Sequence, residues 1–154
     1  IETFTFLTTL GIAIAFPFLI EKWITDNNSI KNYLVKEVEE LIVEAKTNRD
    51  IIEKSYQEEK FDVEHRDAIN FTFHKLELQI ASIQKQFEIS FPKSKSIVDD
   101  LKISFWTYKD YLTDGEMMYS SFTKVDIEFY RKHSNEFSKF ESDLKETIHK
   151  VHRI

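Results

Sequence analysis

Apolar residues recur along most of this chain at the three- and four-residue spacing of amphipathic helices. The clearest stretch is expected to be helical over about Val63–Ser90, where apolar side chains alternate at intervals of four and three residues. That spacing is typical of helices that cross at shallow angles, as in coiled coils. The apolar face predicted for this helix consists of Ile69, Phe73, Leu76, Ile80, Ile83 and Phe87.

Three further segments show the same periodicity. One is expected over about Ser29–Glu59, with a helix cap within the polar stretch 26–29. Another follows the polar loop Lys93–Ser96, begins with Ser96 and Asp99 as a capping box, and ends at an Asp-Gly turn. The last is expected to be long, over about Glu116–His152. The pattern therefore predicts an all-α fold, with an antiparallel bundle of about four long helices.

The opening of the chain has a different pattern. The eighteen residues Thr3–Ile20 contain no charged side chain. As a helix this run would span roughly 27 Å, close to the thickness of a bilayer's hydrocarbon core. Its Phe, Leu and Ile residues favour insertion by about 3 to 6 kcal/mol, before the cost of its Thr, Gly and Pro residues. The run predicts a transmembrane-like helix within residues 1–24, followed by a helical bundle domain over residues 25–154.

Two other interpretations of this run stay open. Ala13-Ile-Ala15 matches the small-x-small pattern of a signal-peptide cleavage site, although no positively charged stretch precedes the run. Alternatively, the run forms a core helix of a soluble protein or of an oligomer. The membrane interpretation is favoured because Lys22 and Trp23 follow the run, and both suit the membrane–water interface as anchors.

Small and hydroxylated residues share one side of the expected membrane helix. At about 100° per residue, Thr5, Thr8, Gly11 and Ala15 fall within about a third of its circumference. Gly11 and Ala15 also form a small-x-x-x-small pair, which permits close approach of two helices. The four residues therefore predict a face for self-association in the membrane. The alternative is that a single-pass anchor simply tolerates them.

Composition excludes several function classes. The net charge is −6 and is spread along the chain, which argues against broad electrostatic binding of DNA. With no Cys, the chain can have neither disulfides nor thiolate zinc sites. Two glycines cannot build a phosphate-binding loop or a dinucleotide fingerprint. We therefore expect a protein that is not an enzyme and needs no cofactor.

Two short motifs have the spacing of Glu-x-x-His metal ligands in di-iron bundles. They are Glu146-x-x-His149 and Asp62-x-x-His65. Glu146 and His149 lie off the apolar stripe of their predicted helix, so solvated surface residues are expected and no metal site. His65 and His133 lie on apolar faces, where a core histidine satisfied by a polar neighbour is favoured over a proton-sensing switch.

The polar loop before the third helix is a candidate for ligand contact. Lys93, Lys95 and Ser96 lie where a helix begins, and free backbone N–H groups and the helix dipole favour an anion there. These three residues are predicted to contact a phosphate group, as in a nucleotide or oligonucleotide. Solvated surface lysines are the alternative.

An N-terminal hydrophobic helix joined to a helical bundle resembles the layout of small membrane effectors of bacterial anti-phage defence. These include the channel-like subunit of Hailong-type systems. The resemblance covers the whole chain as a layout and contains no diagnostic motif, so no functional residue is transferred from it. It implies a homo-oligomer that conducts ions or depolarises a membrane under the control of a nucleotide or oligonucleotide ligand.

Two functional hypotheses follow. The first is a bacterial membrane-associated oligomer that permeabilises or perturbs the inner membrane when triggered. Its bundle would face the cytoplasm, because Lys residues follow the apolar run and none precedes it. The second is a membrane-tethered helical interaction module without channel activity, which binds a partner protein through its heptad faces. Both hypotheses require a lipid membrane as a partner.

Overall fold

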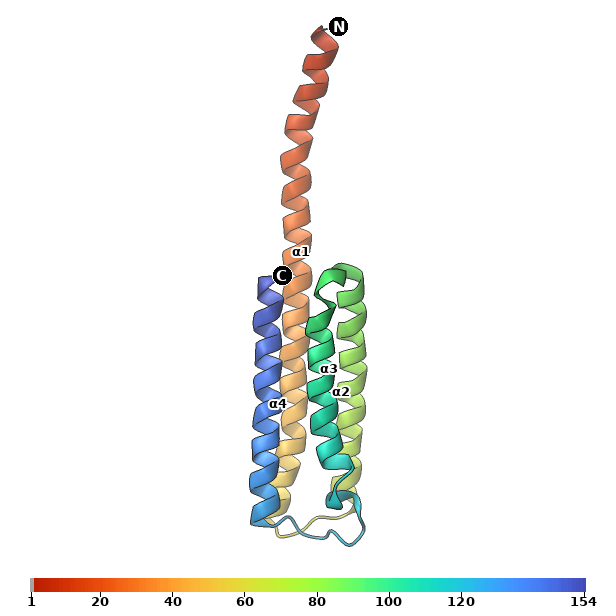
Figure 1. Ribbon diagram of the computed structural model, residues 1–154, viewed down its shortest axis with the longest axis vertical. Coiled ribbons are helices and arrows are strands. Elements are labelled where there is room, and N and C mark those ends of the chain that lie inside the picture. Colours follow the sequence, from red (N-terminus) through yellow and green to blue (C-terminus); the bar gives the residue numbers. More distant parts are fainter. Residues whose placement is uncertain (1) are drawn as a thin grey trace. The chain divides into compact units, whose positions relative to one another are not determined.

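The protein is described by a computed structural model that covers the backbone from Glu2 to Ile154 and the side chains from Glu21 onward. Every regular element in this part of the chain is a helix, which confirms the predicted all-α class (Figure 1). The elements are α1 (Glu2–Gln57), α2 (Val63–Ser90), the 3₁₀ turn η1 (Pro92–Ser94), α3 (Lys95–Thr113), the 3₁₀ turn η2 (Glu116–Met118) and α4 (Ile127–Arg153).

The chain divides into two units, one ending at Tyr33 and the other beginning at Leu34. Helix α1 contributes to both, because it continues without a break to Gln57. The predicted helix start within residues 26–29 is therefore wrong. No Gly or Pro interrupts the chain from Glu21 to Gln57, and the polar side chains of residues 26–29 are mostly exposed, so a continuous helix accommodates them.

Within the unit Leu34–Ile154, the four helices run antiparallel, and each lies beside two others (Figure 1). Polar contacts mark the four pairs of neighbours, and they lie at the surface or half-buried, where such contacts stabilise little. They are Lys75–Glu44 at 3.1 Å between α2 and α1, Lys102–Gln84 at 3.1 Å between α3 and α2, Ser104–Asp143 at 2.5 Å between α3 and α4, and Lys46–Glu141 at 3.7 Å between α1 and α4.

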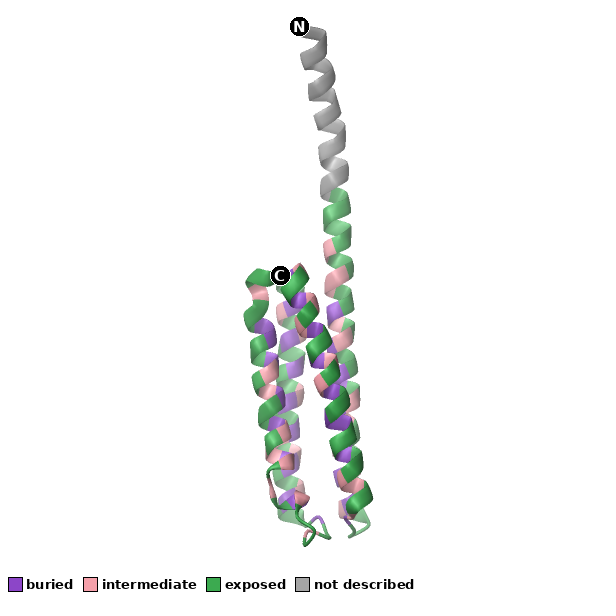
Figure 2. Cartoon of the chain, turned by 90° about the vertical axis from the view of Figure 1, so that its right-hand side faces the viewer, coloured by how far each residue is buried: buried purple, intermediate pink, exposed green. Residues whose placement is uncertain are grey.

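The core of the bundle consists largely of apolar side chains at the helical spacing of the sequence, with Phe61, Phe91 and Met117 added from the connections. Figure 2 shows the buried positions recurring along each of the four helices. All six positions predicted for α2 are buried. Aromatic rings fill the middle of the core, where Tyr108 of α3 stacks on Phe140 of α4 with 5.0 Å between ring centroids. The buried positions predicted and found on α3 are Ile97, Leu101, Phe105, Tyr108 and Leu112.

The last helix begins at Ile127, so the prediction that it starts near Glu116 is wrong. An irregular connection follows η2 instead. Asp126 ends this connection and caps α4, because its Oδ1 accepts a hydrogen bond of 2.7 Å from the backbone N–H of Phe129. An Asp directly before an apolar stripe is a helix-start signal in the sequence. The apolar spacing continues on both sides of Asp126, so the spacing alone does not place the helix start there.

Arg66 of α2 holds the connection between α3 and α4 in its irregular form. Its guanidinium donates to three backbone carbonyls, those of Met117, Tyr119 and Phe122, at 3.0, 3.0 and 2.7 Å. Hydrogen bonds from a charged donor are stronger than neutral ones. The Tyr119 carbonyl also accepts a hydrogen bond of 3.0 Å from the backbone N–H of Phe122, so Arg66 and a local turn together fix the path of this connection.

Candidate functional site

A polar pair interrupts the apolar core where α3 and α4 meet. His133 of α4 has no solvent-exposed surface, and its Nε2 lies 3.1 Å from the hydroxyl of Tyr108, which is also buried. The interpretation of His133 as a core histidine with a polar neighbour is confirmed for this nitrogen. Its Nδ1 has no hydrogen-bond partner among the described residues. We call Tyr108 and His133 the buried pair.

The surroundings of the buried pair keep both groups neutral. Burial, and to a smaller extent the positive charge of Arg49, lower the pKa of His133 from 6.5 to about 4. Burial also raises the pKa of the Tyr108 hydroxyl well above its usual value. A neutral imidazole without exposed surface cannot contact a substrate in this conformation. The buried pair therefore belongs to the core and does not form a catalytic site.

Asn48 of α1 is a further polar group in the core. It is completely buried, and neither its Nδ2 nor its Oδ1 has a partner among the described residues. Asn48 lies three residues after the buried Ala45 and four residues before the buried Ile52, so a polar side chain interrupts an apolar stripe of helical spacing. That interruption in the spacing is the sequence signal that could have identified it. An amide buried without partners costs free energy.

Replacement of Asn48 with Leu is expected to raise the free energy of unfolding by about 1 to 2 kcal/mol, because it removes two unpaired buried polar atoms. Urea unfolding followed by circular dichroism measures the change. Asn48→Asp is the matched control: it keeps the shape, adds a buried charge and should lower stability. If Asn48→Leu lowers stability at an unchanged m value, the amide makes stabilising contacts and this account of it is wrong.

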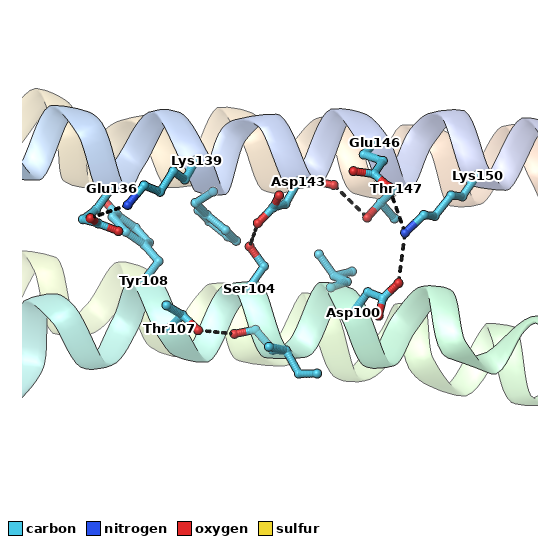
Figure 3. A pocket seen from close by; sticks show the side chains of 13 residues that line it. Asp100, Ser104, Thr107, Tyr108, Glu136, Lys139, Asp143, Glu146, Thr147 and Lys150 are labelled. Atoms are coloured by element: carbon cyan, nitrogen blue, oxygen red, sulfur yellow. Dashed lines mark hydrogen bonds and ion pairs between the residues drawn. The ribbon is translucent and has the colours of Figure 1, made fainter.

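A groove of about 360 Å³ lies between α3 and α4 (Figure 3). Polar side chains from the two helices meet across it. Ser104 donates to Asp143 at 2.5 Å, and the Lys150 ammonium lies 2.9 Å from a carboxylate oxygen of Asp100. The charged residues that line the groove are Asp100, Glu136, Lys139, Asp143, Glu146 and Lys150.

The groove does not present a catalytic set. The Ser104 hydroxyl bonds directly to Asp143, and no His lies between them to activate the hydroxyl. Lys139 and Lys150 each lie within 3.1 Å of a carboxylate, so the protein itself compensates their charges. Ser104 and Asp143 are 39 residues apart in sequence. Their meeting depends on the register of α3 and α4, which residue spacing does not give.

The residues of the predicted membrane segment fall largely outside the described side chains. This applies to the predicted association face, Thr5, Thr8, Gly11 and Ala15. The predicted interface anchors Lys22 and Trp23 are described, and both are exposed. In the part of the chain with described side chains, no helix is both long and apolar enough to cross a membrane.

The residues predicted to contact an anion lie together at the beginning of α3. Lys93 belongs to η1, and Lys95 and Ser96 are the first two residues of α3. All three are exposed. The predicted capping box of Ser96 and Asp99 is wrong, because the N-cap position is Ser94, two residues earlier, and the helix start has no side-chain cap.

The two Glu-x-x-His-like motifs have structural roles. Asp62 accepts hydrogen bonds from two backbone N–H groups of the first turn of α2, and His65 Nδ1 accepts one from the backbone of Asp62 at 3.2 Å. These bonds form a capping box. Glu146 pairs with Lys150, and His149 is exposed. Among the described residues, no group of three or more His, Asp or Glu is placed to hold a metal ion.

Comparison of the chain with protein-family models, with curated proteins and with solved structures gave no match. Its function is therefore argued from its own residues.

Proposed function

We propose that this chain is a membrane-anchored helical protein that self-assembles and permeabilises or perturbs the inner membrane when triggered. The observation that carries the proposal is the uncharged run Thr3–Ile20, which the same chain follows with a helical bundle over Leu34–Ile154. A run of this length and composition is more stable in hydrocarbon than in water. The transmembrane-like helix within residues 1–24, and a bundle that faces the cytoplasm, are parts of this proposal.

The described surface of the bundle favours a role in assembly over a role in catalysis. The lysines of the groove between α3 and α4 are paired with carboxylates, and His133 is enclosed in the core. The layout resembles that of small membrane effectors of bacterial anti-phage defence. We include from that resemblance ion conduction or depolarisation controlled by a nucleotide or oligonucleotide ligand.

A membrane-tethered interaction module without channel activity is the second candidate. Phe71, Leu78 and Ile89 lie on α2 at separations close to whole numbers of helical turns, so they share one side of the helix. Their exposed fractions are 61, 60 and 68 %. An exposed apolar stripe of this kind fits an amphipathic helix of a partner protein.

Leakage from liposomes separates these two functions. The full chain, reconstituted in vesicles loaded with a self-quenching dye, is expected to release the dye if it forms an ion-conducting assembly. Thr8→Leu and Gly11→Leu are each expected to reduce leakage at least about tenfold, because a large side chain blocks close approach of the membrane helices. Flotation with the vesicles should not change, since both substitutions increase apolarity.

Phe6→Leu is the matched control, because Phe6 lies on the opposing side of the predicted membrane helix. It should leak like the parent chain. If Thr8→Leu and Gly11→Leu also leak like the parent chain, the association face is wrong. If the parent chain floats with vesicles but releases no dye, the interaction module without channel activity is the better account.

A further inference from the structure

One end of the bundle carries three exposed cations without ion-pair partners among the described residues. It is formed by the α2–α3 connection and the last turn of α4, and we call it the basic end. No Asp or Glu occurs in residues 89–96 or 149–154. The exposed cations here are Lys93, Lys95 and Arg153. None of the three has an ion-pair partner within 4.0 Å among the residues with described side chains.

The fold brings these residues to the same end. Lys150, near the end of α4, lies 2.9 Å from Asp100 in the second turn of α3, so the last turn of α4 lies beside the start of α3. Figure 1 shows the α2–α3 connection and the C-terminus at one end of the bundle. The segments are distant in sequence, so the cluster arises from the helix arrangement.

The opposite end of the bundle is acidic. It is formed by the α1–α2 and α3–α4 connections with the adjoining helix turns. Its acidic residues are Glu58, Glu59, Asp62, Glu64, Asp114, Glu116, Asp126 and Glu128. Lys60, Arg66 and Lys124 lie in the same segments, 58–66 and 114–128, so eight acidic residues face three basic ones there. At the basic end the nearest acidic residues, Glu88, Asp99, Asp100 and Glu146, lie in the adjoining helix turns.

The chain enters the bundle at the basic end. Helix α1 joins the unit at Leu34, and the thirteen residues Glu21–Tyr33 separate it from the uncharged run. Thirteen residues span no more than about 45 Å even when fully extended. If the run is in a membrane, this length is the upper limit on how far Leu34, where the chain enters the basic end, can lie from the surface of that membrane.

We propose that the basic end binds the anionic lipid headgroups of the membrane that holds the uncharged run. This inference rests on the proposed membrane anchor. Exposed cations near an anionic bilayer are attracted within about one Debye length of its surface. Lys93, Lys95 and Arg153 project from helix ends and no buried polar side chain is shown to converge with them, so they suit an extended charged surface better than a single small anion. Ile89, in the last turn of α2, is 68 % exposed and adds an apolar side chain to this end of the bundle.

The absence of Cys allows a direct test on the full chain. Ser94→Cys places one environment-sensitive fluorophore between the two lysines, and Ser120→Cys places the same probe at the acidic end. The chain is reconstituted in nanodiscs of phosphatidylcholine with or without phosphatidylglycerol. Headgroup-attached quenchers are expected to quench the Ser94 probe only with phosphatidylglycerol. About 1 M salt should abolish the quenching, because the Debye length falls to about 3 Å. The Ser120 probe should stay unquenched throughout.

Charge reversal tests whether the lysines are responsible. Each Lys near an anionic surface contributes about fivefold in binding. The double change Lys93→Glu with Lys95→Glu should therefore lower the ratio of headgroup-bound to water-exposed Ser94 probe at least about thirtyfold. Arg131→Glu with Lys132→Glu makes the same charge change on exposed residues near the acidic end, and should leave that ratio unchanged.

The outcomes separate this inference from the anchor on which it rests. If the chain enters neither kind of nanodisc, the membrane anchor is wrong and this inference fails with it. If the chain enters both kinds but the Ser94 probe stays in water, only the headgroup contact is wrong. The inference is also overturned if a short oligonucleotide changes the Ser94 probe in phosphatidylcholine discs while phosphatidylglycerol does not, because the basic end then binds nucleic acid.

Discussion

Acidification is expected to destabilise the bundle by about 3 kcal/mol through His133 alone. Burial and Arg49 lower the pKa of this imidazole to about 4 in the folded protein, against 6.5 as its ordinary value. Between these two values the unfolded chain binds a proton that the folded bundle does not. The free energy of unfolding therefore falls as the pH falls through this window, with a limiting slope of about 1.4 kcal/mol per pH unit. The contribution is fully present above about pH 6.5 and fully lost below about pH 4.

Urea unfolding of the parent chain and of His133→Gln, at intervals from about pH 7 to pH 4, measures this contribution. Gln cannot be protonated in this range and can bond to the Tyr108 hydroxyl. The carboxylates titrate in both chains, so the difference between the two pH profiles isolates the histidine. Parallel profiles would mean that the folded bundle accepts the imidazolium, for example by a local opening that admits water to Nδ1.

The helices and their buried faces are largely predictable from the sequence. The bounds of α2 were predicted as Val63–Ser90, and its six apolar positions are all buried. The reason is physical: a strict alternation of three- and four-residue spacing allows only one helix face to be removed from water. The boundary at the start of α4 was not predictable from this pattern. It depends on Arg66, which is distant in sequence and bonds to the carbonyls of the connection.

The basic end and the buried pair were predictable from the sequence only in part. Lys93, Lys95 and Ser96 were identified because they are local in sequence and precede a helix. Arg153 could not be added to them from spacing, since its place beside α3 depends on how α3 and α4 are aligned. The same limit applies to the buried pair. His133 stands out within an apolar stripe, but its contact with Tyr108 arises from packing between two helices.

A lysine in place of Leu10 is expected to abolish association of the chain with membranes. The Phe, Leu and Ile residues of Thr3–Ile20 favour insertion by about 3 to 6 kcal/mol, and the polar residues of the run reduce this. A lysine near the middle of a membrane helix costs about 2.5 to 3.5 kcal/mol, and the lost Leu removes about 0.5 more. These terms leave between about 3 kcal/mol in favour of insertion and about 1 kcal/mol against it, and the Thr, Gly and Pro residues of the run shift this sum further against insertion. Since Leu10 lies away from the predicted association face, this effect does not depend on self-association.

Flotation of the full chain with liposomes measures the loss of membrane association. Leu10→Phe is the matched control, because it keeps the run apolar. It should float like the parent chain. The bundle provides an internal test that the Leu10→Lys chain is folded. Its core lies within the unit Leu34–Ile154. The urea midpoint of unfolding, followed by circular dichroism without detergent, should therefore be the same for this variant and for the parent chain. A Leu10→Lys chain that unfolds normally and still floats would show that the run is not inserted in lipid. The membrane proposal would then be wrong, and the helical interaction module would have to be held by other contacts.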